Sequence, residues 1–310
     1  MAIAAAGLMK TFYTFYNFCT CYTFNTFCLL VLSLQASVYC TASEVVDERQ
    51  EPATFINVAL LHIAPVLGDL SANTALVARA MTDAKRYGAD WVMTPELALT
   101  GYKFAGAIGT DWFVDGPDEY VRVLQNKADE LNMVLFLSHL EQDQTTGSAY
   151  NTLFVIDRDG EIIARHRKIN TIPVAEDWSA QGEHVNVAQV DDIRLGLLIC
   201  ADAWPPDHTA ALSDQGVDVI LSSATWPPGR YGPGDVWERR SLESDTPFIV
   251  NNRTGIEGDF DMRKSQSVIA VAGRRLLEFQ SNDNALVVIS FDLNDASVSS
   301  QKVYMLEAEQ

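Results

Sequence analysis

The fold of this 310-residue chain is set by one segment, GLLICADAWPP, which spans residues 196–206. An apolar run ends at Cys200, and small, polar and proline residues follow it directly. This pattern predicts a buried strand with a thiol at its carboxyl end, where the ligand sites of open α/β sheets lie. Cys200 is the one cysteine after residue 40. A thiolate attacks carbonyl carbon well, but a lone buried cysteine more often only packs.

Two other segments place a charged residue at the end of a β-prone run. In WVMTPELALTGY, residues 91–102, Glu96 follows a short apolar run and precedes a Thr-Gly turn. In GEIIARHRKIN, residues 160–170, a β-prone stretch ends in a basic cluster that contains Lys168. Either residue alone also fits an exposed surface position, since charged side chains are mostly exposed. The order of the three segments carries more information than any one of them.

Together the segments resemble the nitrilase superfamily, the carbon–nitrogen hydrolases. That family carries a Glu in P-E-x-x-x-T-G-Y, a Lys in R-K, and a Cys that closes G-x-x-x-C-x-D, in this order. The chain matches with Pro95-Glu96 and Thr100-Gly101-Tyr102, Arg167-Lys168, and Gly196 with Cys200-Ala201-Asp202. Two further matches are YNTLFVIDRDG, residues 150–160, and PFIVNNRTG, residues 247–255. The resemblance covers roughly residues 54 to 292.

Hydrolysis of an amide needs a nucleophile, a proton carrier and positive charge near the oxyanion. Cys200 supplies the thiolate, and Glu96 can take the thiol proton and return it to the departing amine. Lys168 and the backbone N–H of Ala201 can stabilise the oxyanion. The resemblance implies the same Glu-Lys-Cys triad and a second glutamate shortly after the lysine, for which Glu176 is the candidate. Glu176 also fits an ordinary loop carboxylate.

The chain departs from the family around the site. The family often has an aromatic residue directly after the cysteine, then an arginine, and a histidine where this chain has Asn170. Arginine side chains bind carboxylates well. Without the family's arginine, an acidic substrate would need another cation, and Arg230 or Arg253 could reach the site. Trp204 resembles branches that act on carbamoyl amines or glutamine, but tryptophan also packs. The substrate-binding candidates are Tyr102, Asp202, Trp204, Trp226, Arg230 and Arg253.

Composition narrows the function classes. With 22 Lys and Arg against 41 Asp and Glu, the formal charge is −19, which is unsuited to binding nucleic acid. No glycine-rich phosphate loop is present. The five histidines lack metal-ligand spacing, so neither a metal nor a cofactor is expected. The partner expected is a small amide-type molecule.

The first 43 residues differ from the rest. Lys10 is their one charge, and a short apolar core at 28–34 precedes small residues, which is typical of a secretory signal. A membrane anchor and a mis-called start are the alternatives. The chain would be secreted or periplasmic with a signal, membrane-anchored with an anchor, and cytoplasmic with a mis-called start. An acidic linker, 44–53, precedes a hydrolase domain, 54–310.

The body alternates strand and helix patterns and ends in a strand-rich tail. Helices are predicted over residues 71–87, 118–131 and 235–243. Strands are predicted over residues 55–64, 133–137, 153–156, 195–199, 217–221, 248–250 and 285–289. These patterns favour an α/β class with two sheets flanked by helices. The resemblance implies a four-layer αββα sandwich that forms a homodimer or a higher homo-oligomer.

The sequence therefore predicts a thiol hydrolase that cleaves a non-peptide C–N bond of a small amide or carbamoyl compound through a cysteine thioester. Three alternatives stay open: a nitrilase, an N-acyltransferase on the same scaffold, and a non-catalytic binding module. The nitrile-cleaving branch usually carries Trp-Glu after the cysteine, which Ala201-Asp202 does not match.

Overall fold

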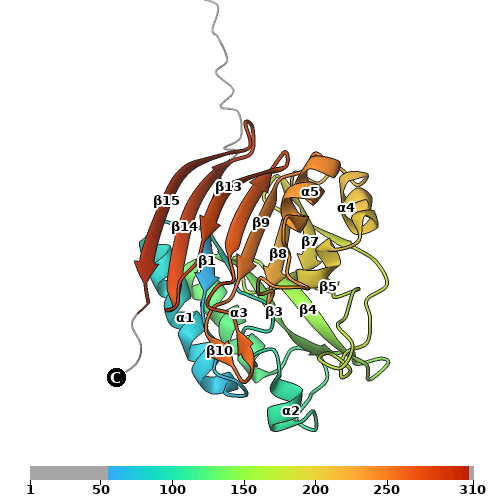
Figure 1. Ribbon diagram of the computed structural model, residues 1–310. Helices are drawn as coiled ribbons and strands as arrows, with labels where there is room; N and C mark the ends of the chain where they lie inside the picture. Colours follow the sequence, from blue (N-terminus) through green and yellow to red (C-terminus); the bar gives the residue numbers. More distant parts are fainter. Residues whose placement is uncertain (1–54, 307–310) are drawn as a thin grey trace, which may run out of the picture. The chain divides into compact units, whose positions relative to one another are not determined.

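The structure is a computed structural model that describes residues 55–306, which form two mixed β-sheets and the helices that cover them (Figure 1). The predicted leader, 1–43, and linker, 44–53, lie outside the described residues. The helices are α1 Leu70–Arg86, α2 Phe104–Ile108, α3 Glu119–Leu131, α4 Pro206–Ser213 and α5 Val236–Glu243. A short 3-10 helix spans Cys200–Ala203.

The first sheet has seven strands in the order β15-β14-β1-β2-β3-β4-β5. Its three central strands, β1, β2 and β3, are parallel, and antiparallel strands flank them on both sides. The strands are β1 Phe55–His62, β2 Trp91–Met93, β3 Val134–Gln142, β4 Ala149–Ile156, β5 Ile162–Arg167, β14 Ala285–Asp292 and β15 Ser297–Met305.

The second sheet has six strands in the order β13-β12-β9-β8-β7-β6, with β7, β8 and β9 parallel. Its strands are β6 Asn186–Val190, β7 Ile193–Ile199, β8 Val219–Ala224, β9 Phe248–Asn252, β12 Ser267–Val271 and β13 Arg274–Phe279. A small separate hairpin pairs β10, Ile256–Glu257, with β11, Phe260–Asp261. Strand β2 and the second half of β7 are buried and carry apolar runs, as expected for strands that are covered on both faces, whereas the edge strand β5 is partly exposed.

The main core fills the space between the two sheets. Leu60 and Phe136 of the first sheet belong to the same buried cluster as Leu197 and Ile249 of the second. The other face of the first sheet packs against α1 and α3, and α4 and α5 contribute Leu212, Trp237 and their neighbours on the outer side of the second sheet. The layers are therefore helix, sheet, sheet and helix, as expected for a four-layer αββα sandwich.

Each helix and strand predicted by range is present with its predicted type, but boundaries shift and several elements are not predicted. Helix α1 begins at Leu70, one residue before the predicted start, because Asp69 is its N-cap and accepts a hydrogen bond from Ala72 N at 3.0 Å. The sequence does not predict β6, β10, β11, α2 or α4, and it covers β12, β13 and β15 only as part of a strand-rich tail. Strand β15 is largely exposed, so it lacks the apolar alternation that marks a half-buried strand.

Candidate active site

Three strand ends bring the candidate catalytic residues together at one edge of the two sheets. Glu96 follows β2 and Lys168 follows β5 in the first sheet, whereas Cys200 follows β7 in the second. The backbone ties these ends across the layers, because Thr225 Oγ1 donates to Glu96 O at 3.1 Å and Glu96 N donates to Ala224 O at 3.4 Å. The site is therefore built where the two sheets meet.

Lys168 is the centre of the charged cluster. Its Nζ donates to Glu96 Oε1 at 2.7 Å and to Glu176 Oε1 and Oε2 at 2.9 and 2.7 Å. Lys168 and Glu96 are fully buried, and Glu176 is 1% exposed. The structure thus brings Glu176 to the triad, with its loop position fixed by Ile172 N, which donates to Oε2 at 2.7 Å. One ammonium is matched to two carboxylates in a site without solvent.

Two further residues hold Glu96, and the sequence gives them no role. Asn151 Nδ2 donates to Glu96 Oε1 at 2.9 Å and to Glu176 Oε1 at 2.7 Å. Thr225 N donates to Glu96 Oε2 at 2.9 Å. Asn151 lies in one of the segments that carry the family resemblance, and this was the signal in the sequence that could have pointed to a role for it in the site. These donors hold the two carboxylate oxygens of Glu96 in fixed positions.

Cys200 sits at a sharp change of backbone direction. Its φ is +50°, in the left-handed region that non-glycine residues rarely adopt, so the strand ends there and the 3-10 helix begins. The thiol donates to Thr225 O at 3.8 Å, and the residue is 4% exposed. The N–H of Ala201 lies in the first turn of the 3-10 helix, where backbone donors have no partner inside the helix. The Ala201 N–H can therefore donate a hydrogen bond to an oxyanion that forms beside the sulfur.

Burial and charge shift the pKa values of the cluster. Burial raises the pKa of the Cys200 thiol well above its ordinary value, and the negative charge of Glu96 adds to this, so the resting residue is a thiol. Burial also raises the pKa of Glu96, although Lys168 partly offsets the shift. Burial lowers the pKa of Lys168, but the charge of Glu96 and its other acidic neighbours outweighs burial and leaves that pKa well above its ordinary value. The lysine is therefore a permanent cation.

Asp202 supports the site from the interior and does not line the cavity above Cys200 that is described below. Its four lone-pair directions are all used, because Oδ1 accepts from Ile169 N and Asn170 N at 3.0 and 2.7 Å, and Oδ2 accepts from Ile199 N at 3.1 Å and contacts His166 Nε2 at 2.9 Å. Burial raises the pKa of Asp202, but the His166 hydrogen bond and charge outweigh it and leave the pKa lowered. The carboxylate links the chain after Lys168 to the chain around Cys200.

A cavity of about 640 Å³ opens above Cys200. Of the predicted substrate-binding residues, it is lined by Tyr102, Trp204, Trp226 and Arg230, together with Ala201. Most of its other lining is apolar, and two aromatic residues that the sequence did not single out contribute, Tyr231 and Phe260. Residues 225–232, in the loop after β8, supply one wall.

Arg253 does not reach this cavity. It is fully buried, its guanidinium pairs with Glu257, and Nε and Nη2 donate to backbone oxygens of Thr254 and Pro65 at 3.3 and 3.4 Å. Glu257 in turn accepts from Tyr102 N at 3.1 Å. Arg253 therefore supports the backbone that carries Tyr102, and both it and Asp202 are corrected from substrate-binding to supporting positions.

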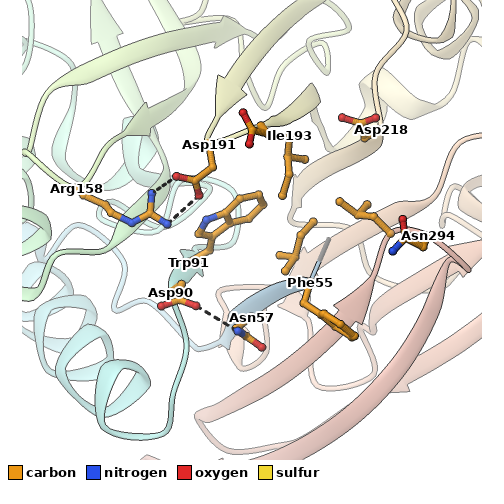
Figure 2. Close-up of a pocket in the computed structure, with 12 residues that line it drawn as sticks. Phe55, Asn57, Asp90, Trp91, Arg158, Asp191, Ile193, Asp218 and Asn294 are labelled. Atoms are coloured by element: carbon orange, nitrogen blue, oxygen red, sulfur yellow. Dashed lines mark hydrogen bonds and ion pairs between the residues drawn. The ribbon is translucent and has the colours of Figure 1, made fainter. Parts of the chain in front are cut away.

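A second cavity, of about 330 Å³, lies at the opposite ends of the strands (Figure 2). Phe55, Trp91 and Ile193, which begin β1, β2 and β7, contribute to its lining. Its lining includes one cation and four carboxylates, and Arg158 donates to both carboxylate oxygens of Asp191, at 2.8 and 2.9 Å. It holds none of the candidate catalytic residues.

Comparison with known proteins assigns the family. The sequence pattern of the carbon–nitrogen hydrolase family matches residues 57–300. The chain belongs to this carbon–nitrogen hydrolase family. Its relatives place it in the amidase-like branch of the nitrilase superfamily, as the sequence motifs predicted. Within residues 55–306 of this carbon–nitrogen hydrolase, no helix has the length and apolar character that a membrane crossing requires.

The chain is similar to several curated or structurally known proteins. It is 28% identical over 252 residues to the glutamine-dependent NAD(+) synthetase of Thermotoga maritima, covering 77% of this chain but 42% of that protein. It is 25% identical to the N-carbamoylputrescine amidase of Solanum lycopersicum, covering 79% and 88%. An amidase variant from Nesterenkonia sp. AN1, with the acetamide moiety of fluoroacetamide added to its active-site cysteine, superimposes with a TM-score of 0.70 at 23% identity, covering 79% and 94%. These likenesses confirm the α/β fold with two mixed sheets.

Proposed function

We propose that this carbon–nitrogen hydrolase is a thiol amidase that cleaves small amides or carbamoyl compounds through a thioester at Cys200. The observation that carries the proposal is the joining of Lys168 to both Glu96 and Glu176 beside a thiol at the floor of a cavity. Fixed charges in a water-poor site act strongly on a developing oxyanion and need no reorganisation during the reaction.

The first half-reaction forms the thioester. Glu96 accepts the thiol proton as the sulfur of Cys200 attacks the amide carbon, so an S–C bond forms and the carbonyl electrons move to oxygen. Lys168 and the N–H of Ala201 stabilise that oxyanion. Collapse breaks the C–N bond, and Glu96 returns its proton to the nitrogen, which leaves as ammonia or an amine.

The second half-reaction restores the enzyme. Glu96 takes a proton from water, the resulting hydroxide attacks the thioester carbon, and the C–S bond breaks. The proton returns to the sulfur, and the acid product leaves. The raised pKa of Glu96 suits a group that both takes and returns protons, since catalytic efficiency is greatest when the pKa is near the working pH.

The test is ammonia release by the full chain from a panel of small amides, carbamoyl compounds and nitriles. We expect release from at least one amide or carbamoyl compound and its loss, by about 10³-fold or more, in Cys200→Ala. Hydroxylamine added during turnover should intercept the thioester and yield a hydroxamate. Turnover that survives Cys200→Ala would refute the mechanism, and release from nitriles alone would point to nitrilase chemistry instead.

A further inference from the structure

The cavity over Cys200 carries a single formal charge among its lining residues, the guanidinium of Arg230. Arg230 is exposed and has no carboxylate partner within the described residues, and its guanidinium lies over the ring of Tyr231, with Cζ 5.2 Å from the ring centre. The other arginines described for the site, such as Arg253 with Glu257, are paired. An unmatched cation at the edge of an aromatic cavity favours an anionic ligand.

The loop that carries Arg230 has a defined shape. Trp226 Nε1 donates to Tyr231 O at 2.7 Å, which closes the turn across Arg230. At the loop's base, Trp226 N donates to Asn252 Oδ1 at 3.1 Å and Asn252 Nδ2 donates to Trp226 O at 2.9 Å. Gly232 N donates to Gly229 O at 3.0 Å inside the turn. The guanidinium is thus presented on a braced turn.

A cationic substrate tail would find no counter-charge in the cavity. Asp259, next to the lining residue Phe260, is already paired with Lys103. The carboxylates of Glu96 and Glu176 are both taken by Lys168 and do not line the cavity. This argues against an amine-terminated substrate of the kind named for the tomato relative.

We infer that the substrate is an amide or carbamoyl compound whose far end bears a carboxylate, and that Arg230 binds that carboxylate while the aromatic walls enclose the apolar spacer. The inference rests on the proposed amidase function and narrows it to a substrate class. Arg230, which lines the same cavity as Cys200, acts as a specificity residue.

Three amides of similar length test this class: glutaramate with an anionic end, hexanamide with a neutral end, and 5-aminopentanamide with a cationic end. We expect kcat/KM to fall in that order. Arg230→Ala should lower kcat/KM for glutaramate by about tenfold or more, through KM, and change the hexanamide value little. Arg230→Lys should recover part of the loss. Arg239→Ala removes the same charge from an exposed position on α5 and should change none of the three.

Calorimetry separates this inference from the function on which it rests. Glutaramate binding to Cys200→Ala should weaken by about tenfold in Cys200→Ala/Arg230→Ala, whether or not the wild type turns it over. Equal binding to the two variants, or hexanamide turned over as well as glutaramate, would overturn the assignment of Arg230. If none of the three amides is turned over but glutaramate still binds in a way that depends on Arg230, the amidase chemistry would be refuted and the assignment of Arg230 would stand.

Discussion

At the scale of single residues, the charged side chains of the site have nearly all of their hydrogen-bonding positions filled, and the chemistry depends on this. Glu96 uses three donors, Asp202 uses four contacts, and Lys168 is shared by two carboxylates. A buried polar group without partners costs free energy, so such saturation holds each group in one orientation. The thiol of Cys200 is the exception: it has one long contact and faces the cavity. The reactive atom is thus the least restrained member of a rigid cluster.

The pH dependence of activity should report Glu96. Because its pKa is raised above the ordinary 4.5, the carboxylate that accepts the thiol proton is lost as pH falls through that raised value. We therefore expect kcat/KM to show an acid limb above pH 4.5. Glu96→Gln should lower kcat/KM by about 10²–10⁴-fold and remove the limb from the residual rate.

The matched control for this measurement is Glu161→Gln, which alters an exposed carboxylate before β5 and should leave the profile unchanged. An acid limb that persists unaltered in Glu96→Gln would assign the limb to a different group, and the base would have to be sought elsewhere in the site.

At the scale of elements, the loop 225–234 should be sensitive to one added methyl group. A Cβ on Gly232 would meet Gly229 N at 2.6 Å and Pro227 O at 2.8 Å, both backbone atoms that cannot move aside without reshaping the turn. Gly232→Ala should therefore raise KM for the preferred amide on the order of tenfold. The rate of Cys200 alkylation by iodoacetamide should change less, since the thiol contacts this loop at Thr225, seven residues before Gly232.

Gly106→Ala is the comparison variant for the loop, because a Cβ at Gly106 would meet nothing within 4 Å. Its KM should equal that of the wild type. If Gly232→Ala also leaves KM unchanged, the loop is a connection and not a wall of the binding site.

How far the sequence predicts this architecture can be judged element by element. Buried strands such as β7 and β8 are predicted well because both of their faces are covered and each contains an apolar run, 195–199 in β7 and 219–221 in β8. The exposed edge strand β15 has no such pattern, and its place depends on pairing with β14. Glu96, Lys168, Cys200 and Glu176 were found from motif order.

The supporting residues could not be found in that way. Asn151 and Thr225 act through contacts between segments that are 55 and 129 positions away from Glu96 in the sequence. Arg253 stands in a matching motif and was expected to reach the substrate, but Glu257 and nearby carbonyls hold it in the interior. Which way a polar side chain faces is decided by tertiary packing, and residue order alone does not encode it.

At the scale of the whole molecule, a buried histidine joins the two sheets. His62 ends β1 of the first sheet, and its Nδ1 lies 3.0 Å from Ser267 Oγ of β12 in the second. Its ring also meets the edge of Phe279 at 5.2 Å between centroids. Burial lowers the pKa of His62 from 6.5 to about 4, although backbone hydrogen bonds at Asn252 and Ser281 oppose the shift.

This shift makes the free energy of unfolding depend on pH. Between pH 6.5 and about 4 the unfolded chain binds a proton at His62 that the folded chain does not, so the contribution is complete above 6.5 and is lost as pH falls toward 4. The loss amounts to about 3 kcal/mol. Urea titrations at several pH values measure it, and His62→Gln should flatten the dependence over this interval.

His184→Gln provides the reference, because His184 is highly exposed and lies beside Glu183 alone. Its stability curve should follow that of the wild type. A curve for His62→Gln as steep as the wild-type curve would mean that other groups cause the acid sensitivity.

The division of the site between two sheets has a kinetic consequence. Glu96 and Lys168 belong to one sheet and Cys200 to the other, so neither half of the chain holds a working set of groups by itself. During refolding, the thiol gains its base and its cation only when the two layers come together over their shared core. The nucleophile therefore has its base and its cation only where both sheets are folded and packed together.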